Sequence, residues 1–177
     1  MIIALIPIKD LIRAKTRLRS IDASIRSEII KAMLRDVIYA YTSSKYVNST
    51  ILITPDRGMR EAIREFDVDV VQDYGYGQIE AYLKAIKDLS ERYEFKAIIF
   101  GVSDTPFISC HDIDNIAKLY TSGFEVVLTP SIDGGTNIML QRFPLVIDLM
   151  HGRDSFQKHL TRAIEKTARV YVYSTLG

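Results

Sequence analysis

The sequence contains very little cysteine, no tryptophan and almost no excess charge of either sign. Its one cysteine, Cys110, can form neither a disulfide within the chain nor a cysteine-rich zinc site, which suits a reducing compartment. The 23 Lys and Arg residues against 22 Asp and Glu give a net charge of +1, which predicts binding to neither nucleic acid nor an anionic membrane. Any anion-binding site must therefore depend on a local group of positive charges and not on the net charge of the protein.

Long apolar runs are also missing from the sequence. No stretch approaches the ~18 apolar residues that a membrane span needs. The first apolar run breaks at Pro7 and no basic leader precedes it, so we expect a cytoplasmic protein without a membrane partner. The 177 residues are 47% hydrophobic and 25% charged, which predicts one globular domain over residues 1–177 and excludes a disordered or fibrous chain.

Patterns typical of strands and helices alternate along the whole chain. Ile2–Pro7 is a short apolar run, typical of a strand buried on both faces, and apolar residues from Ile25 to Tyr41 then recur at helical spacing. This alternation predicts an α/β fold of three layers, with a mostly parallel sheet between helices. Further strands are expected at 50–54, 68–71, 97–102, 126–129, 137–141 and 169–173, and further helices at 57–66, 79–89, 109–123 and 155–166.

The loop after the first strand holds the densest group of cations. In such sheets ligands bind beyond the carboxyl ends of the strands, so the loops after Pro7, Thr54, Val71 and Val102 are the places to search. A basic cluster at the first of these loops suits a polyphosphate, but it is equally consistent with a solvated loop, because no glycine-rich phosphate motif accompanies it. The cluster consists of Lys9, Arg13, Lys15, Arg17 and Arg19, opposed only by Asp10.

Asp104 follows the apolar strand expected at 97–102. A carboxylate at this edge of the sheet could hold Mg²⁺, which often takes only one or two protein carboxylates and completes its shell with phosphates and water. The alternative is an aspartate that opens the turn before Pro106. His111 and His159 lack partners at metal-ligand spacing, so both are interpreted as surface or core residues and not as zinc ligands.

Two helix starts are candidates for contacts with a ligand. Gly75 and Gly77 lie between a strand and a helix without the third glycine of the dinucleotide fingerprint, which excludes a nicotinamide or flavin site. The glycines could let backbone approach a ligand while Gln78 contacts a base, or they could form a plain turn. At Ser155 the first-turn amides could receive a phosphate or carboxylate, and the side chain could cap the helix.

Together these segments resemble one known family. PIKxxxxAKTRL (7–18), the glycine segment (73–78), SDTPFIS (103–109), DGGTN (133–137) and HGRDSFQKHL (151–160) occur in its order and near its spacing. The chain resembles, over nearly its whole length, the 2-phospho-L-lactate and phosphoenolpyruvate guanylyltransferases of coenzyme F-420 biosynthesis. GGTN followed by GxxSFxxHL is the most specific part. The resemblance implies the nucleotide-diphospho-sugar transferase (glycosyltransferase type A-like) fold, Mg²⁺ as cofactor, and GTP and a phospho-acid as substrates.

The resemblance also implies a role for individual residues. Lys15 and Asp104 would be catalytic, and Asp104 would hold the Mg²⁺. The GTP phosphates would contact Lys9, Lys15 and Arg17, the guanosine would lie along Gly75, Gly77 and Gln78, and the phospho-acid would bind Thr136, Gly152 and Ser155.

The chain departs from the family at two places. The family commonly has Asn at the position of Gln78, and its members usually continue into an acidic segment where this chain stops at Gly177. Mg²⁺ would then be held by Asp104 with substrate oxygens and water, or with help from another acid such as Asp133, or catalysis is impaired. The alternatives are a GTP-binding regulatory protein and a nucleotidyltransferase for a sugar phosphate or a molybdopterin, and a homo-oligomer stays open.

Overall fold

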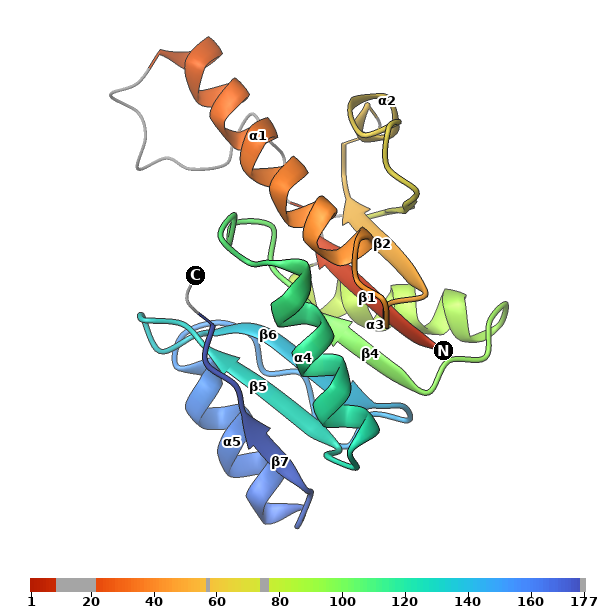
Figure 1. Ribbon diagram of the computed structural model, residues 1–177, viewed down its shortest axis with the longest axis vertical. Helices are drawn as coiled ribbons and strands as arrows, with labels where there is room; N and C mark the ends of the chain where they lie inside the picture. The colour runs from red at the N-terminus through yellow and green to blue at the C-terminus, as the bar shows by residue number, and fades with distance from the viewer. Residues whose placement is uncertain (9–21, 57, 74–76, 176–177) are drawn as a thin grey trace.

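The computed structural model describes residues 1–8, 22–56, 58–73 and 77–175 (Figure 1). These residues form a seven-stranded sheet with helices on both faces. The strands are β1 (Ile2–Pro7), β2 (Ser49–Thr54), β3 (Asp69–Gln72), β4 (Ala97–Phe100), β5 (Val126–Pro130), β6 (Thr136–Arg142) and β7 (Val170–Val172). The helices are α1 (Ala23–Thr42), α2 (Met59–Ala62), α3 (Gln78–Ser90), α4 (Cys110–Thr121) and α5 (Ser155–Glu165).

The strand order is β3-β2-β1-β4-β6-β5-β7, and β6 runs against both of its neighbours. The pairs β1–β2, β1–β4, β2–β3 and β5–β7 are parallel, so the predicted mostly parallel sheet is confirmed. The antiparallel register places Phe100, the last residue of β4, opposite Met139 of β6. As a result, the start of β6 lies at the same edge of the sheet as the end of β4.

The sheet separates two hydrophobic cores. On one face Ala4 and Ile6 of β1 belong to the core formed with α1 and α4, whereas Ile3 and Leu5 belong to the opposite core with α3 and α5. Alternate residues of a strand point to opposite faces, so an unbroken apolar run is what a doubly covered strand requires. The predicted α/β fold of three layers is confirmed.

Local signals in the sequence account for most of the element boundaries. The predicted capping box is present at α4, where the Ser109 hydroxyl accepts from the Asp112 amide and the Asp112 carboxylate accepts from the Ser109 amide. The helix expected at 57–66 is wrong in length, because α2 ends at Ala62. Ile63 leaves helical geometry with φ −123° while its side chain enters the core, and a tight Phe66-to-Ile63 turn follows.

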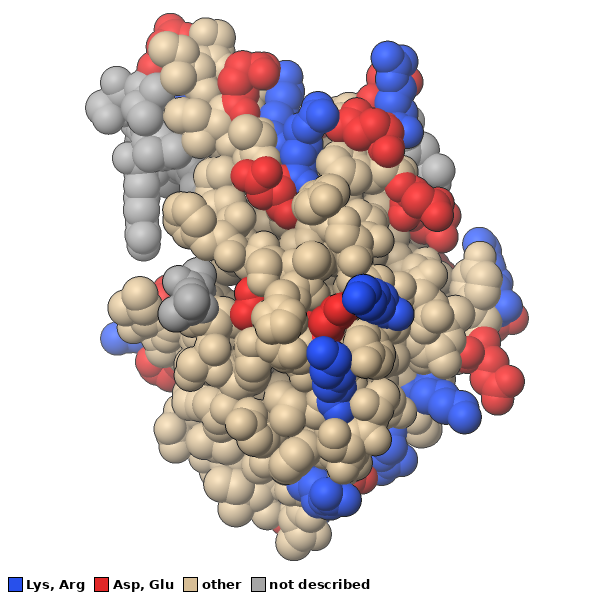
Figure 2. All heavy atoms as spheres, viewed as in Figure 1, with Lys and Arg blue, Asp and Glu red and all other residues tan. Residues whose placement is uncertain are grey.

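Acidic and basic side chains are interspersed on the face that carries α1 and α4 (Figure 2). Arg35 of α1 lies 2.7 Å from Glu65, and Arg64 lies 2.6 Å from Glu61. These pairs are largely exposed, so each contributes little to stability. Among the described residues no helix combines the length and apolar character needed to cross a bilayer.

Gly101, directly after β4, lies between two buried tyrosines from opposite faces of the sheet. The Tyr82 hydroxyl from α3 donates to the Gly101 carbonyl at 2.9 Å. A Cβ atom at position 101 would lie 2.3 Å from the hydroxyl oxygen of Tyr41 from α1. Both tyrosines are fully buried, so neither ring can turn away freely. The strand predicted at 97–102 is wrong in length, because β4 ends at Phe100, although the Gly101 amide still donates to the Leu5 carbonyl at 3.0 Å.

Replacing Gly101 by Ala is expected to destabilise the fold by on the order of 1–3 kcal/mol, because an extra methyl group has no space there. In a Tyr41→Phe background the same replacement should cost less, because the nearest atom is gone. Urea unfolding of the two single variants and the double variant measures this difference. Equal costs of Gly101→Ala in both backgrounds would show that the Tyr41 hydroxyl is not the obstacle.

Candidate active site

The candidate site lies where β1, β2 and β4 reach their carboxyl ends and β6 begins. This edge receives the turn after β4 with Asp104, the start of α3 with Gln78, and the start of α5 with Ser155. Thr136 is the first residue of β6, so the reversed direction of this strand brings the segment 133–137 to the same edge. Two of these four segments, the turn with Asp104 and the start of α3, follow strands after which the sequence analysis predicted a ligand site.

Thr136, Ser155 and His159 form a buried hydrogen-bonded cluster at this edge. The Ser155 hydroxyl donates to the Thr136 hydroxyl oxygen at 3.3 Å, and Nδ1 of His159 lies 3.0 Å from the same oxygen. Thr136 is 7% exposed, Ser155 2% and His159 0%. The structure thus brings together two of the three residues that the resemblance implies for the phospho-acid.

The protonation state of His159 follows from its second contact. The backbone amide of Met150 donates to Nε2 at 2.9 Å, so Nε2 has to be the unprotonated nitrogen. The proton of the neutral ring then resides on Nδ1 and is donated to Thr136. Burial, with smaller contributions from the nearby His151 and Lys158, lowers the pKa of His159 to about 4. The ring is therefore neutral at pH 7.

The loop 150–155 takes its shape from backbone contacts around Gly152. Gly152 has φ +126°, a conformation that favours glycine, and its carbonyl accepts from the Ser155 amide at 3.2 Å. The Phe156 amide donates to the Gly134 carbonyl at 3.2 Å, which ties α5 to the turn before β6. The prediction of free amides at this helix start is therefore wrong for Ser155 and Phe156.

The sequence also suggested that Ser155 caps α5, and the structure shows that it does not. The capping position belongs to Asp154, which has a left-handed φ of 55° and makes no side-chain capping bond. Ser155 is the first helical residue, and its hydroxyl points to Thr136 instead. The side chain is thus available to the site and not used by the helix end.

His151 and Tyr82 form an aromatic wall beside this cluster. The His151 ring lies 5.3 Å from the rings of both Tyr82 and His159. Its Nε2 is buried without a hydrogen-bond partner in the described part of the chain, and burial lowers its pKa to about 4. Gln78 at the start of α3 lies 3.5 Å from the Tyr82 hydroxyl, so this wall connects the two helix starts.

Asp104 lies exposed in the turn after β4, so the turn interpretation and the metal interpretation are both compatible with its position. The residues that the structure describes contain no group of three or more His, Cys, Asp or Glu side chains placed to hold a metal. A lone carboxylate suits Mg²⁺ bound largely by phosphate oxygens and water, and it does not suit zinc. Gly77, with φ +118°, precedes α3 and needs glycine for that conformation.

Part of the predicted site lies outside the described residues. Lys9, Lys15, Arg17 and Gly75 fall in the segments 9–21 and 74–76, so their roles remain predictions.

The role of His159 is what the sequence reasoning missed, since this histidine was interpreted only as a surface or core residue, and the structure confirms that it lies in the core. It lies four positions after Ser155 on α5, and residues at this spacing share one face of a helix. The spacing of four residues from Ser155, which was predicted to bind phosphate, is therefore the signal that could have identified His159. Tyr82 and His151 carried no comparable signal, because their contacts join segments far apart in the sequence.

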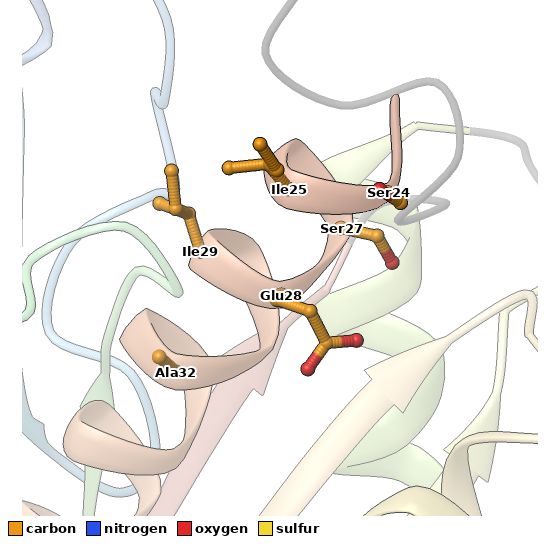
Figure 3. Close-up of a pocket in the computed structure, with 6 residues that line it drawn as sticks. All are labelled: Ser24, Ile25, Ser27, Glu28, Ile29 and Ala32. Carbon is orange, nitrogen blue, oxygen red and sulfur yellow. The ribbon is translucent and has the colours of Figure 1, made fainter. Parts of the chain in front are cut away.

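A hollow lined by other residues lies beside the first turns of α1 (Figure 3). In Figure 3 the side chains of Ile25 and Ile29 project from one side of the helix. The described residues that line the hollow are Ser24, Ile25, Ser27, Glu28, Ile29 and Ala32. None of these described residues is a lysine or an arginine.

Solved structures with the same arrangement of elements define the class of fold. A structure described as a nucleotide-diphospho-sugar transferase from Desulfovibrio desulfuricans G20 superposes with a TM-score of 0.78 at 13% identity, covering 98% of this chain and 79% of the other. A nucleotidyl transferase from Methanothermobacter thermautotrophicus gives a TM-score of 0.62 at 16% identity, covering 100% and 88%. The protein therefore has the nucleotide-diphospho-sugar transferase fold.

Sequence similarity identifies the family within this fold. Residues 2–176 match the family described as "Guanylyl transferase CofC like", and the chain belongs to that family. It is 31% identical over 173 residues to a 2-phospho-L-lactate guanylyltransferase of Methanothermobacter thermautotrophicus, covering 97% of this chain and 75% of the relative. It is also 31% identical over 172 residues to a phosphoenolpyruvate guanylyltransferase of Roseiflexus sp. (strain RS-1), covering 96% and 75%. The predicted resemblance is confirmed.

The two buried histidines predict a loss of stability in mild acid. Folding lowers the pKa of His151 and His159 to about 4, so the unfolded chain, with histidine pKa values near ~6.5, binds more protons between these values. Their contribution to stability is complete above about pH 7 and is lost as the pH falls from about 6.5 towards 4. His151→Phe keeps an aromatic ring and is expected to lose less stability than the wild type between pH 7.5 and 5.

Urea unfolding at both pH values measures this effect. His111→Phe is the matched control, because His111 is exposed on α4 and both buried rings remain. The same loss of stability in His151→Phe and the wild type would contradict a neutral, buried His151.

Proposed function

We propose that this protein transfers GMP from GTP to the phosphate of a phospho-acid, either 2-phospho-L-lactate or phosphoenolpyruvate, and releases pyrophosphate in coenzyme F-420 biosynthesis. The family match over residues 2–176 supports the guanylyl transfer. The observation that carries the acceptor site is the contact of Thr136 with Ser155 at the carboxyl edge of the sheet, where four separate sequence segments meet.

The buried cluster has the chemistry to receive a phospho-acid. Two hydroxyl groups and the loop at Gly152 offer small polar contacts beside the aromatic wall of Tyr82 and His151. The side chains of this cluster and of the aromatic wall are neutral at pH 7, so they do not balance the charge of the substrates. Lys9, Lys15 and Arg17 are our candidates for this task at the GTP phosphates.

The reaction needs no catalytic base. A phosphate monoester has a second pKa near ~6, so the acceptor is already mostly a dianion at pH 7. One of its oxygens attacks the α-phosphorus of GTP, and the bond from that phosphorus to the bridging oxygen of pyrophosphate breaks. Positioning of the two anions and stabilisation of the pyrophosphate are then the main requirements. Burial lowers the pKa of His151 and His159 to about 4, which makes them weak bases and agrees with a reaction that needs no base.

Asp104 is our candidate ligand for Mg²⁺, with the remaining positions taken by phosphate oxygens and water. When bound, the ion would neutralise negative charge on the triphosphate. The role of the chain is to present the carboxylate in the turn after β4, close in sequence to the clamped Gly101. Asp133 remains the second acid that could assist, since its carboxylate already holds the turn before β6 through the Gly135 amide at 3.2 Å.

Asp104→Ala is expected to lower turnover at least tenfold, since the main carboxylate proposed for the metal is lost. Pyrophosphate release is measured with GTP and each phospho-acid, before and after EDTA and with Mg²⁺ restored. Asp67→Ala is the control, because Asp67 is exposed before β3 at the opposite edge of the sheet. Unchanged turnover in Asp104→Ala would remove Asp104 from the mechanism, and activity that survives EDTA would remove the metal.

Lys15→Ala is expected to weaken GTP binding roughly tenfold or more while leaving the affinity for the phospho-acid nearly unchanged, because a charged contact to phosphate is lost. Calorimetric titration with GTP measures the change. Lys87→Ala, in the last turn of α3, removes an equal charge away from the candidate site and serves as control. If both variants bind GTP equally well, the basic loop does not hold the phosphates.

A further inference from the structure

His159 has two hydrogen bonds whose directions are fixed, and together they determine how Thr136 can bond. The Met150 amide is a backbone donor, so Nε2 accepts and Nδ1 carries the proton. Nδ1 therefore donates to the hydroxyl oxygen of Thr136 at 3.0 Å, and the Ser155 hydroxyl donates to the same oxygen at 3.3 Å.

A threonine hydroxyl has two acceptor lone pairs and one hydrogen. In this cluster both lone pairs of Thr136 are taken by donors, so its own hydrogen is left for an acceptor outside the cluster. The three side chains are buried, which keeps water from replacing either donor at low cost. An oriented hydroxyl of this kind is suited to an anionic oxygen and is poorly suited to a ligand that offers only donors.

We infer that His159 is a positioning residue, which fixes Thr136 as a hydrogen-bond donor to an anionic oxygen of the acceptor substrate. The inference rests on the proposed function, because the ligand it describes is the phospho-acid. His159 also holds the Met150 amide in the loop that leads to Gly152, so one ring connects α5, β6 and this loop. His159 belongs to α5, which packs beside β5 and β7 (Figure 1).

Two conservative variants separate the contacts of the ring. In His159→Asn the amide nitrogen takes the place of Nδ1 and can still donate to Thr136, whereas the contact with Met150 is lost. In His159→Gln the longer amide reaches towards the place of Nε2 and can accept from Met150, whereas the donor to Thr136 is lost. A residue that only supports the fold would show no preference for the Nδ1 contact.

The KM for each phospho-acid and for GTP is measured in both variants, with and without Thr136→Val. We expect His159→Gln to raise the KM for the phospho-acid about tenfold, because an oriented bond to an anion is lost, and His159→Asn to change it by about twofold or less. The KM for GTP stays unchanged in both. In the Thr136→Val background, neither variant should change the KM for the phospho-acid further. Equal effects of Asn and Gln, or an effect that persists without the threonine hydroxyl, overturn the inference.

Two further measurements keep the inference testable if a variant does not fold or if the enzyme does not turn over. Nitrogen-15 NMR of the wild-type histidines should show His159 protonated on Nδ1, and protonation on Nε2 would overturn the inference. Calorimetry with phosphoenolpyruvate compares affinities without chemistry. A wild-type protein that binds phosphoenolpyruvate but releases no pyrophosphate contradicts the proposed transfer alone, and one that binds no phospho-acid overturns the inference about His159.

Discussion

The reversed direction of β6 is the constraint on which the candidate site depends. If β6 (Thr136–Arg142) ran parallel to β4, it would begin at the opposite edge of the sheet, about 20 Å away for a strand of its length. Because β6 is antiparallel, Thr136 begins beside the place where β4 ends. The amide of Phe156 then joins the start of α5 to the turn before β6. One change of direction therefore brings Thr136 and Ser155 next to the turn that carries Asp104.

Because the buried cluster is neutral, the cluster and the charged part of the site have different tasks. His151 and His159 are held uncharged by burial, and Thr136 and Ser155 contribute only dipoles. Neutral groups can orient an anion but cannot balance several negative charges. The cations of the segment 9–21 and a metal at Asp104 are suited to that second task. Orientation of the acceptor and compensation of charge would thus come from separate parts of the chain.

The sequence predicts the layers well because they depend on local patterns. The unbroken apolar run of β1, the helical spacing in α1 and the capping box of α4 each carry their structure within a few residues. The pairing partner of β6 has no such signal, since it depends on which neighbour buries more apolar surface. The same limit applies to the site. Thr136 and Ser155 were found through motifs, while the contact of His159 with both Thr136 and Met150 required the fold.

Gly101 determines how the turn with Asp104 can move. The carbonyl of Gly101 is held by Tyr82 from one face of the sheet, and its Cα lies against the Tyr41 hydroxyl from the other. Gly101, where the chain leaves β4, is thus held in place by the hydrophobic cores on both faces of the sheet. Any movement of Asp104 towards a ligand has to occur by rotation about backbone and side-chain bonds after Gly101. Because Asp104 follows so soon after Gly101, its carboxylate can reach only a small region around the turn. The substrate would therefore have to bind within that region.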